Sequence, residues 1–185
     1  MHTDGHHRLL LVVDDNQGDL ILAEEAASEV GMQADVRRES SGGDAISYLE
    51  QVSEHHAPRP DLILLDINMP GVNGFEVLTY IKHRPELDDI PVFMLSSSTR
   101  EADVSEAEHR GADGYLGKPS DFADYVSIMQ RLGTWMEGCR HGATSSRRPL
   151  SPNVLPGPSR RIGSRAPSAH RTSARRIWHP RRSGG

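Results

Sequence analysis

Acidic, hydroxyl and amine side chains directly follow the short apolar runs of this sequence. Asp14 and Asp15 follow the first run, and the later runs are followed by Asp66, Ser96 and Lys118. Three carboxylates in one site repel one another, and an uncompensated buried charge costs on the order of several kcal/mol. The set therefore favours a hard divalent cation such as Mg²⁺, which takes oxygen ligands and keeps water molecules that a phosphate can displace.

These side chains converge only if the apolar runs are strands of one sheet. Four short, nearly continuous apolar runs predict strands buried on both faces, at residues 9–13, 62–65, 92–95 and 114–116. A more polar run at residues 34–39 predicts an edge strand. The carboxyl ends of parallel strands meet at one edge of a sheet, where binding sites of such folds collect.

Helical patterns separate the predicted strands. Apolar residues recur at helical spacing in segments 18–31, 43–52, 74–83, 101–111 and 121–136. Five alternations of strand and helix predict right-handed crossovers and a parallel sheet covered on both faces. The pattern indicates an α/β fold, either flavodoxin-like or Rossmann-like.

The two parts of the chain carry opposite charge. Residues 1–137 contain 10 Lys and Arg against 26 Asp and Glu, whereas residues 138–185 contain 11 Arg and no acidic residue. The Arg-, Ser-, Pro- and Gly-rich second part has no apolar periodicity, so we expect a disordered tail over 138–185. A folded domain over 8–137 and a flexible N-terminus over 1–7 account for the rest.

Cysteine content and hydropathy exclude several classes of protein. The single cysteine, Cys139, allows neither a disulfide framework nor a cysteine metal site. No apolar run approaches the roughly 18 residues of a membrane span. We therefore expect a soluble, cytoplasmic protein that does not bind membranes.

Four ordered motifs resemble the receiver domain of two-component response regulators. They are VVDD at 12–15, LLDINMPGVNGFEVL at 64–78, FMLSSS at 93–98 and GADGYLGKP at 111–119. The resemblance implies a flavodoxin-like, doubly wound parallel sheet of five strands, in the order 2-1-3-4-5, with five helices. The segments LSSSTREADV and KPSDF and the tryptophan of the last helix are most similar to single-domain regulators that partner phytochrome-type histidine kinases.

The resemblance also assigns a phosphorylation site and a metal site. It implies that Asp66 takes a phosphoryl group from a kinase phosphohistidine to form an aspartyl phosphate. It implies that Asp14, Asp15 and Asp66 hold Mg²⁺ together with the backbone carbonyl of Asn68. The plainer alternatives are that Asp66 caps a turn and that Asp14 or Asp15 caps the first helix.

Further residues would bind the phosphate and switch the surface. The resemblance implies that the Ser96 hydroxyl donates to a phosphoryl oxygen, with Ser97 beside it in the same loop. It implies that Tyr115 turns inward when that hydroxyl moves; the alternative is a tyrosine packed permanently in the sheet. It also implies a cis peptide between Lys118 and Pro119 that aims the lysine at the phosphate.

The last helix carries more apolar surface than one buried face needs. Its predicted core-facing stripe is Phe122, Val126, Met129, Leu132 and Met136. Additional apolar residues beside that stripe, which suggest a contact surface, are Tyr125, Ile128 and Trp135. We therefore expect a homodimer through the fourth helix, fifth strand and fifth helix.

The sequence thus predicts a single-domain response regulator that a sensor histidine kinase, such as a bacteriophytochrome, phosphorylates on Asp66. We expect a phosphoacceptor with slow dephosphorylation and no enzymatic turnover. An aspartyl-phosphate phosphohydrolase is an alternative, but such enzymes usually place a general acid two residues after the nucleophile, where this chain has Asn68. A nucleic-acid-binding protein acting through the basic tail is another, disfavoured because the folded part is acidic.

Overall fold

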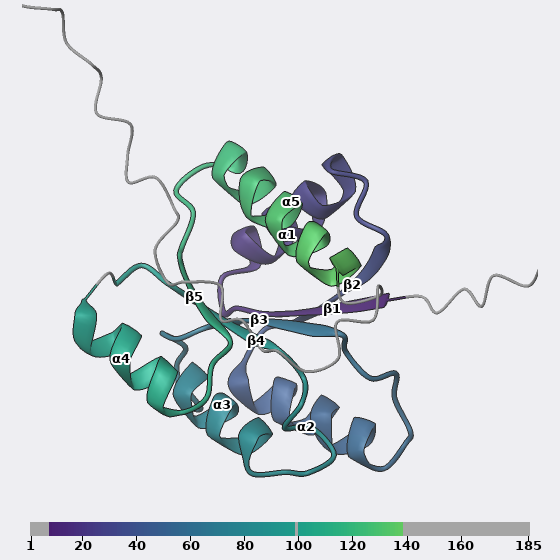
Figure 1. Ribbon diagram of the computed structural model, residues 1–185, viewed down its shortest axis with the longest axis vertical. Helices are drawn as coiled ribbons and strands as arrows, with labels where there is room; N and C mark the ends of the chain where they lie inside the picture. The colour runs from purple at the N-terminus through teal and green to yellow at the C-terminus, as the bar shows by residue number, and fades with distance from the viewer. Residues whose placement is uncertain (1–7, 99, 139–185) are drawn as a thin grey trace, which may run out of the picture. The chain divides into compact units, whose positions relative to one another are not determined.

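Five strands and five helices alternate in the computed structural model, which describes residues 8–98 and 100–138 (Figure 1). The strands are β1 (Arg8–Val13), β2 (Ala34–Glu39), β3 (Leu62–Asp66), β4 (Val92–Ser96) and β5 (Gly114–Gly117). The helices are α1 (Gln17–Glu29), α2 (Gly42–Ser53), α3 (Gly74–Lys82), α4 (Glu101–His109) and α5 (Phe122–Gly138). The predicted flexible N-terminus lies outside the described residues, as does the predicted tail from residue 139 onward. Within the described part, no helix has the length and apolar character that crossing a bilayer requires.

The five strands form one parallel sheet with the order β2-β1-β3-β4-β5, which confirms the flavodoxin-like prediction. The pairing aligns the carboxyl ends of the central strands. Val13 pairs with Leu65, Asp66 with Leu95, and Ser96 with Gly117. Because of this register, the residues that end or follow β1, β3, β4 and β5 lie along one edge. The strand order reverses between β1 and β3, and binding sites of doubly wound sheets form at such a point.

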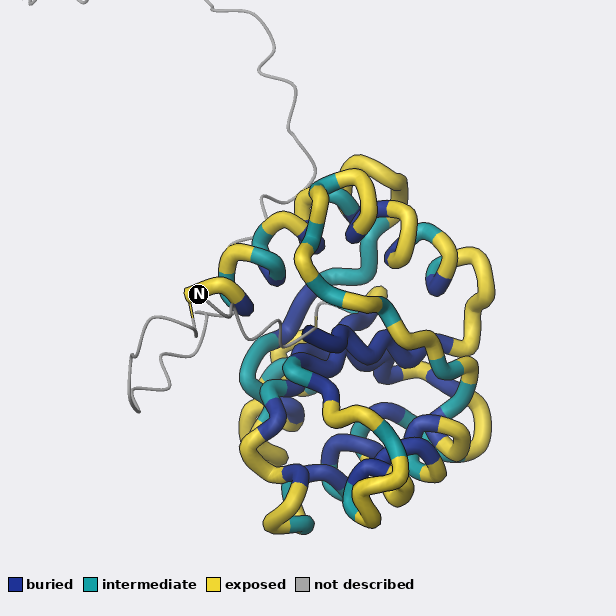
Figure 2. The backbone as a smooth tube through the Cα atoms, turned by 90° about the vertical axis from the view of Figure 1, so that its right-hand side faces the viewer, coloured by how far each residue is buried: buried dark blue, intermediate teal, exposed yellow. Residues whose placement is uncertain are grey.

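Alternating side chains of the sheet build two separate hydrophobic cores. Helices α1 and α5 cover one face over residues such as Leu10 and Leu64, and α2, α3 and α4 cover the other over residues such as Leu11 and Met94 (Figure 1). The strands are buried along their length, whereas the helices expose their outer sides (Figure 2). Burial on both faces explains why the central strands are nearly continuous apolar runs.

The apolar stripe of α5 differs from the predicted one. Its buried residues are Tyr125, Ile128, Met129, Leu132 and Met136, which recur at helical spacing. Tyr125 and Ile128 are each only 2% exposed, so their assignment to an interface is wrong. Phe122, assigned to the core, is 39% exposed, and Val126 is partly buried. The error arose because α5 packs against both α1 and the sheet, so its buried face is rotated and wider than one stripe.

Trp135, the third predicted interface residue, also packs inward in part. Its ring meets the ring of Phe93 edge to face, with centroids 5.5 Å apart and an interplanar angle of 76°. Such aromatic pairs stabilise by about 0.5–1.5 kcal/mol beyond the area they bury. The packing of α5 on the sheet therefore explains its extra aromatic residue without a dimer.

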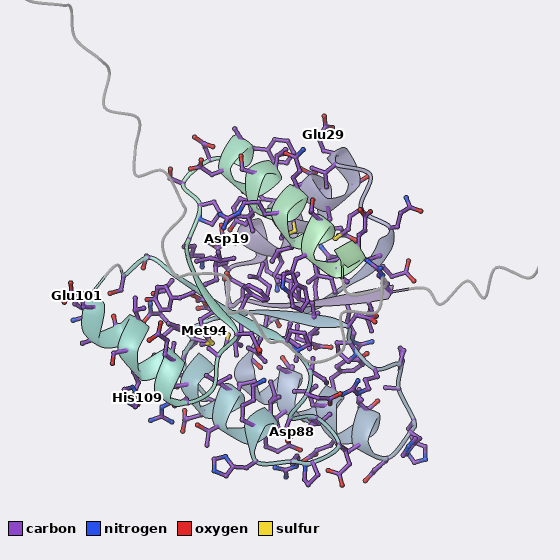
Figure 3. The ribbon with its side chains drawn as sticks, in the orientation of Figure 1. Asp19, Glu29, Asp88, Met94, Glu101 and His109 are labelled. Atoms are coloured by element: carbon purple, nitrogen blue, oxygen red, sulfur yellow. The ribbon has the colours of Figure 1, made fainter. Side chains whose placement is uncertain are left out.

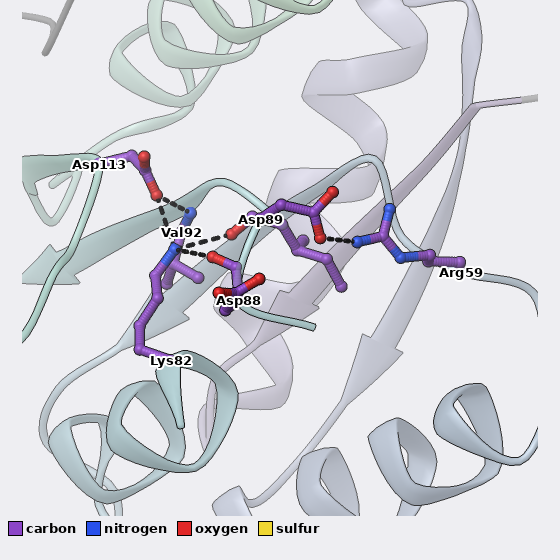
Figure 4. A network of polar contacts seen from close by, with 7 residues as sticks. Arg59, Lys82, Asp88, Asp89, Val92 and Asp113 are labelled. Carbon is purple, nitrogen blue, oxygen red and sulfur yellow. Dashed lines mark hydrogen bonds and ion pairs between the residues drawn. The ribbon is translucent and has the colours of Figure 1, made fainter. Parts of the chain in front are cut away.

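A polar network joins the segments at the amino ends of β4 and β5, opposite the carboxyl ends described above (Figure 4). The Lys82 ammonium donates to the carbonyl oxygens of Asp88 and Ile90, both at 3.0 Å, and pairs with Asp113 at 3.1 Å. The same Asp113 oxygen accepts from the backbone N–H of Val92 at 2.9 Å. Lys82 thus joins the end of α3 to the segments that precede β4 and β5. These contacts hold the amino ends of the two strands, opposite the ends at which the carboxylates lie.

The start of α3 lies so close to the end of β3 that only glycine fits there. A Cβ on Gly74 would lie 2.2 Å from the carbonyl oxygen of Asp66 and 2.9 Å from the Cα of Ile67. We expect Gly74→Ala to lower the free energy of unfolding by about 1–3 kcal/mol, because backbone must shift to admit the methyl group. Urea unfolding of the full chain measures this.

Gly43→Ala serves as the matched control. Gly43 lies in the first turn of α2, and the nearest atom to an added Cβ is the Ser41 hydroxyl at 3.8 Å. This variant should be neutral or more stable by up to about 1 kcal/mol, since alanine favours helix. Equal stability of the two variants would contradict the proposed close contact at Gly74.

Candidate functional site

The acidic residues after β1 are held for a purpose other than helix capping. The cap of α1 is Asn16, whose side chain accepts from the backbone N–H of Gly18 at 2.9 Å. Asp14 accepts from the backbone N–H of Asn16 at 2.9 Å, which fixes its carboxylate at the end of β1. The alternative that Asp14 or Asp15 caps the helix is therefore wrong.

Three carboxylates meet at the point where the strand order reverses. One oxygen atom each of Asp14, Asp15 and Asp66 lies within 4.8 Å of the others. Asp14 and Asp66 are only 1% and 2% exposed, whereas Asp15 is open to solvent. Oδ1 of Asp66 is buried and has no hydrogen-bond partner among the described residues. A buried, unpartnered oxygen within a group of carboxylates fits a hard divalent cation, which takes oxygen ligands.

Lys118 supplies the positive charge of the site. Its ammonium lies 2.8 Å from Oδ2 of Asp14 and 3.6 Å from Oδ2 of Asp66. It also lies 2.9 Å from Oδ2 of Asp19, in the first turn of α1. Burial alone would lower the pKa of Lys118, but hydrogen bonds to Asp14 and Asp19 and the charges of Asp14 and Asp66 outweigh it, so the pKa is raised. The lysine is therefore cationic at neutral pH.

The two buried carboxylates resist ionisation. Burial raises the pKa of Asp66, the Lys118 charge lowers it in part, and the charge of Asp14 raises it again. Burial likewise raises the pKa of Asp14, against the hydrogen bonds from Lys118 and from the backbone of Asn16. The effect of Lys118 is thus smaller than the combined effect of burial and of repulsion between the carboxylates, and a second cation would relieve that repulsion.

Sequence reasoning missed two residues of this site. Asp19 falls within the predicted helical segment 18–31, but nothing in the sequence indicated that the first turn of α1 brings it to Lys118. Tyr125 was assigned to a surface, yet its buried hydroxyl has no hydrogen-bond partner among residues 8–98 and 100–138. Burial raises the pKa of Tyr125, and the charge of Asp19 raises it further. Figure 3 shows Asp19 on the α1 and α5 side of the sheet, and Met94 on the opposite side.

The predicted switch residues lie on the strands beside the carboxylates. Ser96 ends β4, is buried, and accepts from the backbone N–H of Ser98 at 3.0 Å. Tyr115 is buried and donates from its hydroxyl to the carbonyl oxygen of Ser98 at 2.8 Å. Ser97 is exposed, and no hydrogen bond among the described residues joins it to the carboxylates. Ser96 and Tyr115 thus both hold the loop after β4, by way of Ser98.

The Lys118–Pro119 junction differs from the expectation. No peptide bond in the described part of the chain is cis, so the implied cis bond is wrong here. A trans bond before proline is favoured by about 0.5–1 kcal/mol unless the surroundings select the other form. With a trans bond, the backbone N–H of Lys118 donates to the carbonyl of Ser96 at 2.7 Å, which continues the pairing of β4 with β5. This pairing brings the lysine side chain to the carboxylates.

Asn68 lies two residues beyond Asp66 and is exposed. Its backbone N–H lowers the pKa of the Asp66 carboxyl, with less effect than burial, Lys118 or Asp14. A role for its carbonyl oxygen as a metal ligand stays a prediction.

Comparisons with known proteins support this arrangement. Response regulator Rcp1 of Synechocystis sp. is 33% identical over 132 residues, which cover 70% of this chain and 90% of that protein. The Mn²⁺-bound form of Rcp1 matches with a TM-score of 0.63 at 32% identity, over 70% of this chain and 95% of that one. The phosphorylated cyanobacterial phytochrome response regulator RcpA matches with a TM-score of 0.66 at 33% identity, over 72% and 96%. Similar proteins thus include a metal-bound form and a phosphorylated form.

A family model extends the agreement over most of the folded part. The model of the response regulator receiver domain matches residues 10–130, from β1 into α5, and includes Asp14, Asp66 and Lys118. Neither the phosphohydrolase nor the nucleic-acid-binding alternative is supported by the comparisons. The chain belongs to the response regulator receiver family, as its ordered motifs predicted.

Proposed function

We propose that Asp66 accepts a phosphoryl group from a phosphohistidine of a sensor kinase. The supporting observation is a buried carboxylate with one unpartnered oxygen and a lysine ammonium 3.6 Å from the other. In the transfer, an Asp66 oxygen attacks phosphorus, a P–O bond forms, and the P–N bond breaks. The electron pair of the broken bond returns to the imidazole nitrogen. In-line transfer of this kind needs positioning and charge neutralisation more than a strong base.

A metal ion would complete the site, and we propose Mg²⁺. Asp14, Asp15 and Asp66 would hold it, together with the backbone carbonyl of Asn68. The all-oxygen donor set and the small number of carboxylates fit Mg²⁺, which keeps several water molecules. When bound, the ion would neutralise charge on the transferring phosphoryl group.

Side chains of β4 and β5 would bind the modified group. Lys118 is charged and close to Asp66, so it would donate a charge-assisted hydrogen bond to a phosphoryl oxygen. Ser96 would turn its hydroxyl to another oxygen, giving up the backbone N–H of Ser98. Tyr115 holds the carbonyl of the same Ser98, so this movement would alter the surface formed by α4, β5 and α5.

The chain would act as a phosphoacceptor and not as an enzyme with turnover. Asn68 occupies the position two residues after Asp66 where a phosphohydrolase needs a general acid, so hydrolysis of the aspartyl phosphate would be slow. Likeness to the phytochrome response regulator RcpA favours a phytochrome-type kinase as the phosphoryl donor. The transfer would take place in the cytoplasm. A homodimer through α4, β5 and α5 stays part of this proposal, without Tyr125 and Ile128 as contacts.

The phosphorylation site can be tested directly by mass. With acetyl phosphate and Mg²⁺, the full chain should gain one acid-stable, base-labile phosphoryl group, and Asp66→Asn should gain none, because an amide is a poor nucleophile. Asp88→Asn changes an exposed carboxylate in the segment between α3 and β4; it is the control and should label like the wild type. Undiminished labelling of Asp66→Asn would refute the assignment.

Mg²⁺ should raise the melting temperature of the full chain. A ligand bound only by the native state stabilises it by mass action, by about 2.7 kcal/mol at one hundred times the dissociation constant. Asp15→Asn should weaken this response, and it should raise the metal-free melting temperature by relieving repulsion with Asp14 and Asp66. Scanning calorimetry at fixed ionic strength measures both, and a melting temperature indifferent to Mg²⁺ would rule out the metal site.

Phosphorylation should change how the chain associates with itself or with its kinase. The phosphoryl dianion should draw the Ser96 hydroxyl away from Ser98, and the Tyr115 hydroxyl should move with the Ser98 carbonyl. The surface formed by α4, β5 and α5 would then bind a second copy or the kinase with a different affinity. Ser96→Ala should abolish this shift while leaving phosphorylation of Asp66 in place. Sedimentation of modified and unmodified protein, with and without kinase, tests this, and identical behaviour throughout would leave the switch without support.

A further inference from the structure

Lys118 forms an ion pair with a carboxylate, Asp19, that has no part in the proposed phosphoryl transfer. An ammonium has three N–H donors. Two carboxylates are within hydrogen-bond distance of it, Asp14 at 2.8 Å and Asp19 at 2.9 Å. Asp66, at 3.6 Å, is beyond that distance. In the unmodified protein the lysine therefore donates a hydrogen bond to Asp14 at 3.0 Å and forms a close ion pair with Asp19, whereas Asp66 lies farther from it.

Asp19 is built into this position by two helices. It lies in the first turn of α1, and the side chains of Asp19 and Lys118 are each 18% exposed. The hydroxyl of Tyr125, from α5, is buried and has no hydrogen-bond partner among the described residues, and burial and then the charge of Asp19 raise its pKa. An ion pair with this little exposure is stronger than a surface pair, because water screens it less.

A metal ion at this site would not compete for the ion pair between Lys118 and Asp19. The group of carboxylates that could hold a cation is Asp14, Asp15 and Asp66, and it does not include Asp19. A cation would share the Asp14 carboxylate with Lys118. Asp19 would then be the strongest ion-pair partner of Lys118 until Asp66 is phosphorylated.

We propose that Asp19 is a positioning residue that holds Lys118 back from Asp66 and competes with the phosphoryl group for its ammonium. The inference rests on the proposed function, in which Lys118 binds a phosphoryl oxygen. The competition sets how readily the site is phosphorylated and how firmly the product is held. Asp19 touches neither Asp66 nor the phosphoryl group and acts only through Lys118.

Neutralising Asp19 should therefore release the lysine. In Asp19→Asn the amide oxygen can still accept a hydrogen bond from the ammonium, but the attraction between the two opposite charges is lost. With acetyl phosphate and Mg²⁺, we expect the apparent second-order rate constant of labelling to rise about three- to tenfold. At equilibrium, the dissociation constant for beryllofluoride, a phosphoryl mimic, should fall by a similar factor. Labelling rates or beryllofluoride affinities equal to or below those of the wild type would overturn the proposal.

Two controls separate positioning from a general change of charge. Glu25→Gln removes the same charge from the exposed side of α1 and should leave both measurements unchanged. In a Lys118→Ala background, Asp19→Asn should have no further effect, since the residue that it restrains is gone. An equal gain in Glu25→Gln, or a gain that persists without Lys118, would show a long-range field effect and overturn the proposal.

Failure of this inference can be told apart from failure of the proposed function. If Asp66→Asn still labels, the proposed phosphorylation site falls; if it does not label while Asp19→Asn matches the wild type, only the role of Asp19 falls. Asp19→Ser is the second variant, checked by circular dichroism, and should show the same gain. Unfolding of both variants would show that Asp19 serves stability, which would also overturn the proposal.

Discussion

Repulsion among carboxylates that share one lysine is the constraint around which this molecule is organised. Asp14 and Asp66 are almost fully buried, their pKa values are raised by that burial, and Lys118 offsets their charge only in part. A stable domain would ordinarily avoid such a group, because each buried charge without compensation is destabilising. The hydrophobic cores on both faces of the sheet stabilise the domain despite this repulsion, and the remaining negative charge would attract a cation.

The parallel sheet is what brings these groups together. Its register aligns the ends of β1, β3, β4 and β5, so residues more than one hundred positions apart, Asp14 and Lys118, form an ion pair. Close approach of α3 at Gly74 fixes the backbone of Asp66 from behind. At the other edge, Lys82 ties the segments that enter β4 and β5. The carboxylates are thus held in place by the register of the sheet and by the close packing of α3.

The sequence predicted what local pattern decides and missed what packing decides. All five strands and five helices were expected within a few residues, because buried parallel strands are continuous apolar runs and helices have a 3.6-residue period. The acidic cluster followed from strand ends alone. Asp19 was missed because its partner lies on β5, and the rotation of α5 was missed because periodicity does not reveal that a helix packs on two neighbours. The bond before Pro119 depends on the same kind of tertiary context.

The role of Asp19 and the buried face of α5 were both missed because they depend on tertiary packing. Together they show a second route by which the site is connected to the rest of the domain. Ser96 and Tyr115 link it to the loop after β4 and to the core beneath α2, α3 and α4. Asp19 and Tyr125 link it to the opposite core, between α1 and α5. Lys118 lies close to Asp14 and Asp19 and 3.6 Å from Asp66, so a phosphoryl group on Asp66 would draw the ammonium away from Asp19. A phosphoryl group would thus act on both faces of the sheet, through one ammonium with three donors.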